Sequence, residues 1–227
     1  MIEFNPPLIE GLFVRRYKRF FADIEVAGIG LVTAHCANTG RMTGLLIPGS
    51  RVWIRPQPPG RKLLYAWELI EIDSHLVCVN TARANQLMAS TALSEWLPGA
   101  ELIRREPRVG AHRFDLECSR VGAPVYVEIK SVTLWEGGEG WFPDAPSKRA
   151  NSHVRLLSEM ARKGVEARLL MVSMHSGIQS IRPSVHIDPE FEEVCHDAIN
   201  AGVIIEATAA RITLDTIRFG EFLPCII

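Results

Sequence analysis

The chain has 227 residues, a length that suits one large domain or two small domains with real cores. Hydrophobic residues make up 47%, charged residues 22%, and the net charge is −1. This composition excludes wholesale disorder and a dedicated nucleic-acid coat protein, which needs a strong positive charge.

No apolar run approaches the roughly 18 residues that span a bilayer, and the acidic N-terminus MIEFNPPLIEG does not resemble a signal peptide. We therefore expect a soluble cytoplasmic protein with no membrane partner. The five cysteines are widely spaced and form no CxxC pair, so we expect buried or free thiols and no zinc site.

The first 80 residues predict a small barrel. Short runs rich in Val, Ile, Leu and aromatic residues alternate with Gly, Pro and Asn turn signals, and no run predicts a helix. The expected strands are Leu12–Tyr17, Phe20–Val26, Gly30–Cys36, Arg51–Arg55, Leu63–Ile72 and His75–Val79. Five or six strands of this length favour an OB-like β-barrel, which we assign to residues 1–80.

Residues 81–227 predict a mixed sheet flanked by helices, which makes the whole chain α+β. The expected helices are Thr81–Trp96, about Pro146–Lys163 and about Pro189–Ala201. The expected strands are Leu102–Val109, Arg113–Cys118, Val125–Leu134, Ala167–Met174, Val203–Ala207 and Ile212–Thr216. Ala167–Met174 is continuously apolar, as expected for a strand buried on both faces.

Asp115, Glu128 and Lys130 form the sharpest candidate site. Side chains alternate along a strand, so Glu128 and Lys130 share one face, about two residue rises or roughly 6–7 Å apart. The opposite face is apolar and consists of Val125, Val127 and Ile129. A hairpin turn near Gly122 would place Asp115 beside this strand. Two carboxylates there would supply oxygen ligands for Mg²⁺ or Mn²⁺, and the lysine could serve an attacking water.

The alternative is a solvated pair of Glu128 and Lys130 on an exposed sheet face. Strand alternation alone favours the solvated pair; the apolar flanks and the position of Asp115 at hairpin distance make the two interpretations equally good.

The Asp115, Glu128 and Lys130 pattern resembles the PD-(D/E)XK nuclease superfamily, and further segments resemble the sugar fermentation stimulation protein A family. These segments are Arg16–Phe20, Asn38–Met42, Trp67–Leu69, Val79–Thr81, Asn85, Val127–Leu134, Phe142–Ala145 and His186–Asp188. The resemblance implies a DNA-binding protein with an OB-like N-terminal domain and a PD-(D/E)XK nuclease-like C-terminal domain. Ala150 stands where that family typically has glycine.

Other residues extend the candidate site. Glu106 could be a third metal ligand, or an ordinary surface residue. Arg149 and His153 share one helix face and could hold a phosphate near the metal, or could be a solvated face with a half-buried histidine. Asp144 could cap the second helix, which we favour, or contact the site.

The barrel also carries a candidate nucleic-acid surface, in which cations alternate with aromatic residues: Arg15, Arg16, Tyr17, Lys18 and Arg19. Such a surface suits phosphate neutralisation and base stacking, although an exposed strand face with core aromatics beneath it explains the pattern equally well.

Two functions follow. The first is a DNA-binding protein with a Mg²⁺-dependent phosphodiesterase site, and the second is a non-catalytic DNA-binding regulator that affects sugar metabolism. No dinucleotide cofactor is expected, because the glycine-rich fingerprint is missing from the sequence. The oligomeric state stays open.

Overall fold

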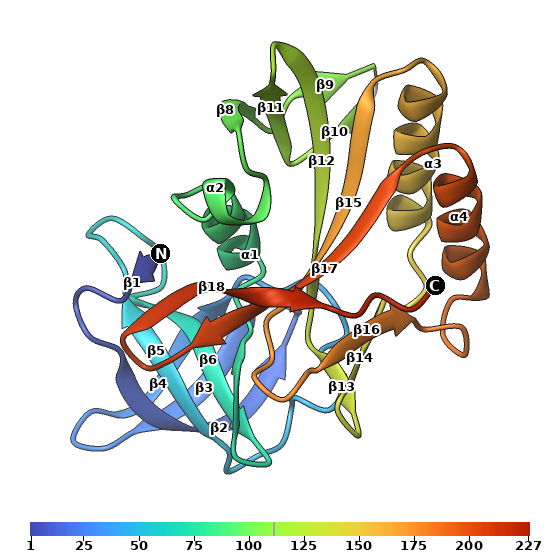
Figure 1. Ribbon diagram of the computed structural model, residues 1–227. Coiled ribbons are helices and arrows are strands. Elements are labelled where there is room, and N and C mark those ends of the chain that lie inside the picture. Colours follow the sequence, from blue (N-terminus) through green and yellow to red (C-terminus); the bar gives the residue numbers. More distant parts are fainter. Residues whose placement is uncertain (111) are drawn as a thin grey trace.

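The structure is a computed structural model that describes residues 1–110 and 112–227. Figure 1 shows a small barrel of N-terminal strands beside a larger sheet that carries the helices. The barrel strands are β2 (Ile9–Tyr17), β3 (Phe21–Val26), β4 (Gly30–Cys36), β5 (Arg51–Pro56), β6 (Tyr65–Ile72) and β7 (His75–Cys78).

The larger sheet has the order β1-β18-β17-β15-β12-β11-β8. Its strands are β1 (Ile2–Glu3), β8 (Ala100–Arg105), β11 (Leu116–Arg120), β12 (Ala123–Val132), β15 (Glu166–Ser173), β17 (Ile204–Ile212) and β18 (Thr216–Leu223). The helices are α1 (Ala82–Met88), α2 (Leu93–Trp96), α3 (Lys148–Arg162) and α4 (Pro189–Asn200).

The N-terminal barrel closes because β4 pairs with β6 in parallel, in addition to the antiparallel ladder of the other strands. Inward-facing apolar residues fill it, and Phe13 stacks on the buried Trp67 at its centre. The OB-like barrel predicted from the sequence is confirmed.

The larger sheet is mixed, as predicted, because β12, β15 and β17 run parallel while the outer strands pair antiparallel. Helices cover both faces. On one face α1 and α2 pack on Val125, Val127 and Ile129 of β12, and on the other α3 and α4 pack on β15 (Figure 1). The continuous apolar run in β15 reflects this burial on two faces.

The helix predicted over Thr81–Trp96 is divided into α1 and α2. The Ser90 hydroxyl donates to the carbonyl of Leu87 and accepts from the amide of Ala92, which competes with the helical hydrogen bonds. The strand predicted over Ile212–Thr216 is instead a turn between β17 and β18. There the Thr213 hydroxyl accepts from the amides of Asp215 and Thr216.

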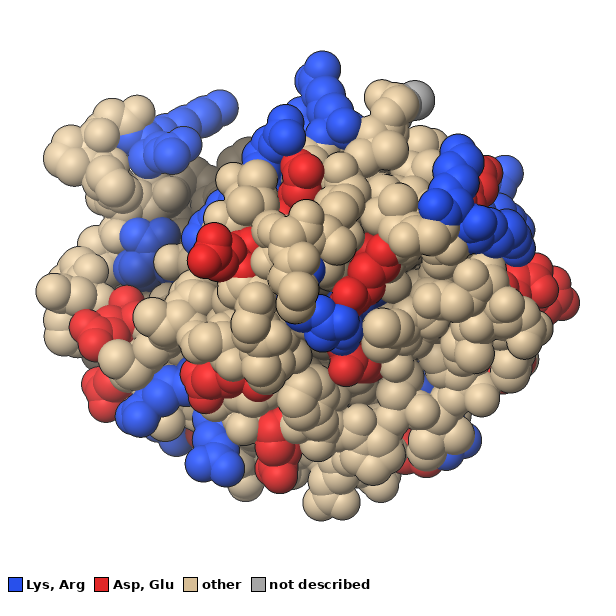
Figure 2. Space-filling model, turned by 45° about the horizontal axis from the view of Figure 1, so that its top comes forward, with Lys and Arg blue, Asp and Glu red and all other residues tan. Residues whose placement is uncertain are grey.

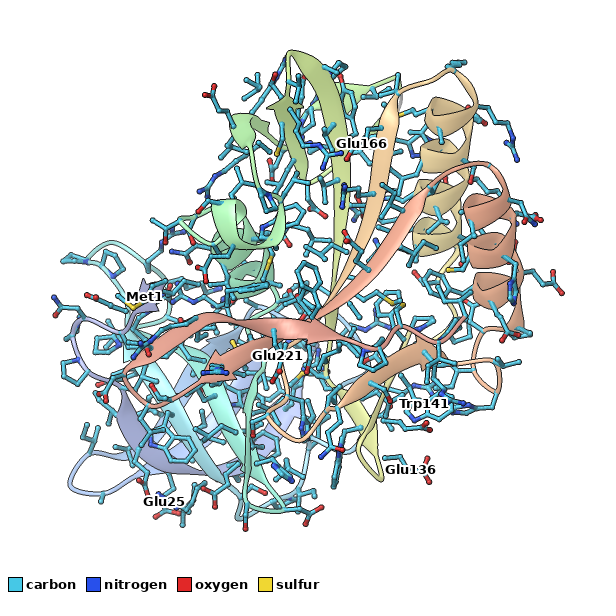
Figure 3. The ribbon with its side chains drawn as sticks, in the orientation of Figure 1. Met1, Glu25, Glu136, Trp141, Glu166 and Glu221 are labelled. Atoms are coloured by element: carbon cyan, nitrogen blue, oxygen red, sulfur yellow. The ribbon has the colours of Figure 1, made fainter. Side chains whose placement is uncertain are left out.

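A small sheet that the sequence did not predict follows β12 directly. It has the order β13 (Leu134–Glu136), β14 (Glu139–Phe142) and β16 (Ser180–Pro183), and a separate short pair joins β9 (Arg108–Val109) to β10 (His112–Arg113). Figure 3 shows Glu136 at the tip of the β13–β14 hairpin and Trp141 on the returning strand.

None of the described helices combines the length and the hydropathy needed to cross a bilayer. All five cysteines are free thiols, four of them buried.

Glu68 joins the barrel to the helices. Its fully buried carboxylate on β6 accepts hydrogen bonds from Arg55, Asn80 and Arg83, at 2.9, 3.0 and 2.7 Å. Since Arg83 lies in α1, this ion pair fixes the first helix of the C-terminal part against the barrel.

We expect Glu68→Ala to destabilise the fold by about 3–5 kcal/mol, because it leaves the mostly buried Arg83 guanidinium unpaired. Urea unfolding would measure the change. Glu10→Ala is the control, since the Glu10–Arg51 pair is exposed and solvent screening leaves it little effect on stability. Equal losses in the two variants would contradict the coupling.

His175, which follows the end of β15, contacts the barrel. It bridges to Val77, its ring stacks on Trp135, and its Nδ1 accepts from the Gly177 amide at 3.0 Å. Burial, together with the neighbouring ring of His75, lowers the pKa of His175 from 6.5 to about 4.

Between pH 6.5 and 4 the unfolded chain therefore binds a proton at His175 that the folded chain does not, so stability falls as pH falls, by at most about 3 kcal/mol. His175→Asn should reduce this pH dependence. Urea unfolding at several pH values would measure it, and an unchanged slope between pH 4 and 6.5 would refute the assignment.

Candidate functional site

The β11–β12 hairpin brings Asp115 to the strand that carries Glu128. The chain turns at Val121 and Gly122, both with positive φ, and the register pairs Leu116 with Val127. The Asp115 amide donates to the Val127 carbonyl at 3.2 Å. The turn expected near Gly122 is therefore present, and it places Asp115 beside the middle of β12.

The Asp115 carboxylate is held by two donors from different elements. Its Oδ2 accepts from the Ile129 amide at 2.7 Å, and its Oδ1 accepts from the Asn85 side chain in α1 at 2.5 Å. Burial raises the pKa of Asp115 to about 6, and the negative charge of Glu128 adds to the effect.

Glu128 is 3% exposed and lies on the β12 face that is turned toward α3. Its Oε1 is 2.5 Å from the Lys130 ammonium and 2.5 Å from Nδ1 of His153. Burial opposes ionisation, but the hydrogen bond from His153 and the charge of Lys130 outweigh it and lower the pKa of Glu128. The other oxygen, Oε2, is buried and has no hydrogen-bond partner among the described residues.

This arrangement fits a divalent cation. A buried carboxylate oxygen without a partner is costly, and a second carboxylate nearby has its pKa raised partly by repulsion. A cation between the two groups would relieve both effects. Within the described residues no three acidic, His or Cys side chains cluster as ligands. Two carboxylates suit Mg²⁺, which keeps several waters and binds substrate phosphates.

The two carboxylates line a cavity of about 370 Å³ at the junction of the two parts of the chain. Its other walls come from the barrel loop Asn38–Gly40, the start of α1, the β13–β14 hairpin, Asp144 and Arg149. Lys130 also lines the cavity, so a cation and a phosphate group would both find oppositely charged partners there.

The remaining residues predicted for the site differ in whether they lie at the cavity. Arg149 lines the cavity on the first turn of α3 and is exposed. His153, expected to contact nucleic acid, is 5% exposed and contacts Glu128 instead, because α3 packs over β12 at this point. Glu106 does not line the cavity: its side chain is 66% exposed and pairs with Arg113, so we exclude it from the ligand set.

The residues Arg15–Arg19 of the barrel, predicted to bind nucleic acid, differ in their contacts. Arg15 pairs with Asp23, which the Tyr17 hydroxyl also contacts, so these two residues stabilise the strand pair. The Arg16 guanidinium binds the carbonyls of Asn38, Gly40 and Arg19. Lys18 and Arg19 form the exposed β2–β3 turn with positive φ.

Two further residues contribute to the site. Asn85 holds Asp115 from α1, and the sequence marks it through its place among the segments that resemble the sugar fermentation stimulation protein A family. Of the two roles that the sequence leaves open for Asp144, the helix cap is wrong, because Ser147 caps α3. The Asp144 carboxylate accepts from the Met42 amide at 2.9 Å and lines the cavity.

Comparison with known proteins identifies the family. Residues 14–79 match the model described as SfsA N-terminal OB domain, and residues 80–216 match that of the sugar fermentation stimulation protein RE domain. The chain belongs to the sugar fermentation stimulation protein family. The resemblance predicted from the sequence and the α+β fold class are both confirmed.

Relatives match over nearly the full length. The homolog from Pseudoalteromonas atlantica is 41% identical and covers 100% of both chains, and that from Pseudomonas paraeruginosa is 41% identical over 98% of this chain and 99% of its own. The structure of Pyrococcus furiosus SfsA in complex with Ca²⁺ is similar over 100% of both chains, with a TM-score of 0.91 and 28% identity.

We expect Ca²⁺ to raise the melting temperature of the wild-type protein, since a ligand of the folded state stabilises it by about 2.7 kcal/mol at 100 times its Kd. Glu128→Gln should lose this response, because it removes the charge of the unpartnered carboxylate. Thermal unfolding with and without Ca²⁺ would test this. Glu106→Gln is the control and should respond like wild type; loss of its response would restore Glu106 to the site.

Proposed function

We propose that this protein is a divalent-metal-dependent nuclease that binds nucleic acid, most directly DNA, at the junction of its barrel and its mixed sheet. The observation that carries the proposal is the buried Oε2 of Glu128, which has no hydrogen-bond partner among the described residues; Glu128 and Asp115 line the same cavity. The similar structure of Pyrococcus furiosus SfsA in complex with Ca²⁺ supports divalent-metal use.

In this proposal Asp115 and Glu128 would hold Mg²⁺ or Mn²⁺, and the bound ion would supply Lewis-acid activation of the phosphoryl group and of a water. The protein's own residues do the rest. Asn85 and the Ile129 amide fix the Asp115 carboxylate, and His153 fixes that of Glu128. These contacts keep the two carboxylates in place before substrate arrives.

Lys130 supplies the cation nearest to the carboxylates. Its ammonium shares Glu128 Oε1 with His153, and it can donate its remaining hydrogens to an attacking water or to a phosphoryl oxygen. Arg149 on the cavity wall can neutralise a second phosphoryl oxygen. Together they would offset the negative charge on the phosphoryl oxygens in the transition state.

Affinity for nucleic acid would arise from local contacts. On the face drawn in Figure 2, Lys and Arg occur in separate groups with Asp and Glu between them. Since the net charge is −1, binding cannot be explained by attraction of the phosphates to a large positively charged surface. The cavity between the two parts of the chain is the better candidate. A cytoplasmic location would give it access to DNA and to Mg²⁺.

We expect the purified protein to cleave labelled DNA or RNA with Mg²⁺ or Mn²⁺, and Lys130→Ala to lower the rate by at least about 100-fold through loss of transition-state stabilisation. Single-stranded, duplex and structured substrates resolved on denaturing gels would show this. Lys62→Ala, which removes an exposed lysine outside the cavity, should retain the rate.

No cleavage of any substrate by the wild type with either metal would refute the nuclease. Binding that persists in that case would favour the second function, a non-catalytic DNA-binding regulator that affects sugar metabolism.

A further inference from the structure

A second cavity, of about 600 Å³, adjoins the cavity lined by Asp115 and Glu128, which we call the metal cavity. The two share four wall residues: Thr39, Gly40, Phe142 and Asp144. The second cavity is lined on the barrel side by Arg16, Arg19 and Arg41, and on the other side by the segment Phe142–Ser147, which leads into α3. A channel with three arginines on one wall therefore leads away from the proposed metal site.

The walls of this channel are preformed. The Arg16 guanidinium binds the carbonyls of Asn38 and Gly40 at 2.6 and 3.1 Å, and the Thr81 hydroxyl donates to Ala37 at 3.1 Å. A Cβ at Gly40 would lie 2.9 Å from Oδ2 of Asp144, so the backbone of the barrel loop closely approaches the opposite wall. The barrel loop and the segment before α3 are thus held at a fixed separation.

The three arginines of the channel differ in availability. Arg16 is committed to backbone carbonyls. Arg19 and Arg41 are exposed, and no described residue accepts a hydrogen bond from either guanidinium. The acidic group on the shared wall is Asp144, and its Oδ2 is occupied by the Met42 amide. Two unpaired guanidinium groups on one wall are suited to bind phosphate oxygens.

We propose that this second cavity binds the phosphates next to the scissile one on a single nucleic-acid strand, with Arg19 and Arg41 as its contacts. The inference rests on the proposed function, because it takes the metal cavity as the cleavage site. The fixed walls favour one strand over two: cavities of about 370 and 600 Å³ have the size of small-ligand pockets. Duplex DNA, whose major groove alone is about 12 Å wide, would not enter them.

Fluorescence anisotropy with a short labelled oligothymidylate, and with a duplex of equal length, would test the proposal over a range of salt concentrations in EDTA. We compare wild type, Arg19→Gln with Arg41→Gln, and the matched control Arg61→Gln with Lys62→Gln. The control removes the same charge from exposed barrel residues outside both cavities.

The wild type should bind the single strand more tightly than the duplex. The Arg19 and Arg41 double variant should bind the single strand at least roughly tenfold more weakly at low salt. Its slope of log K against log salt should be smaller by about 1.4, from two lost contacts at about 0.7 each. Arg19→Lys with Arg41→Lys should restore the slope, because lysine keeps the charge.

Tighter duplex binding, or an Arg19 and Arg41 variant indistinguishable from wild type or from the control, would overturn the proposal. Thermal unfolding of each variant verifies that the fold is intact. Binding is measured without cleavage, so the two proposals can fail separately. If the Arg19 and Arg41 variant both binds and cleaves normally, the proposed phosphate site in the second cavity is wrong and the nuclease proposal stands. If this variant shows the expected change in salt slope but the wild type never cleaves, the second cavity is supported and the nuclease proposal is wrong.

Discussion

The burial of the Glu128 carboxylate is the constraint on which the site depends. A carboxylate in the middle of a sheet loses its hydration, so its charge has to be compensated by neighbours. Lys130 and His153 compensate one oxygen, and the other has no hydrogen-bond partner in the part of the chain that the structure describes. Such a group costs stability unless something binds it, and this cost is the physical basis of the proposed metal site.

Four elements form the site around Glu128 and Asp115, and each has a separate reason to be there. β12 presents Glu128 and Lys130 on one face because its other face is apolar core. α3 covers that polar face and supplies His153. The hairpin from β11 delivers Asp115, and α1 supplies Asn85 to hold it. The barrel acts indirectly, since Glu68 fixes α1 through Arg83.

The sequence predicted the parts that depend on local pattern. Strict alternation from Val125 to Lys130 was enough to put Glu128 and Lys130 on one face, and a glycine turn was enough to bring Asp115 near. Turn-rich strands predicted the barrel. Each of these follows from backbone geometry within a short segment.

The rest depends on packing between distant segments. His153 holds Glu128 from 25 positions away, and Asp144 reaches Met42 across 102. Helical spacing alone could not show whether His153 faces solvent or sheet. Glu106 had the right chemistry, but its positive φ lies at a turn that directs it to Arg113. Ser90 divided a helix because its hydroxyl competes with the backbone.

Whether Asp115 and Glu128 share one cation can be measured in a crystal structure of the Mn²⁺-soaked protein by anomalous diffraction. We expect an anomalous peak in contact with Oε2 of Glu128 and with the Asp115 carboxylate. A structure with no peak there, in which Mn²⁺ binds elsewhere and Glu128 contacts Lys130 and His153 alone, would contradict it.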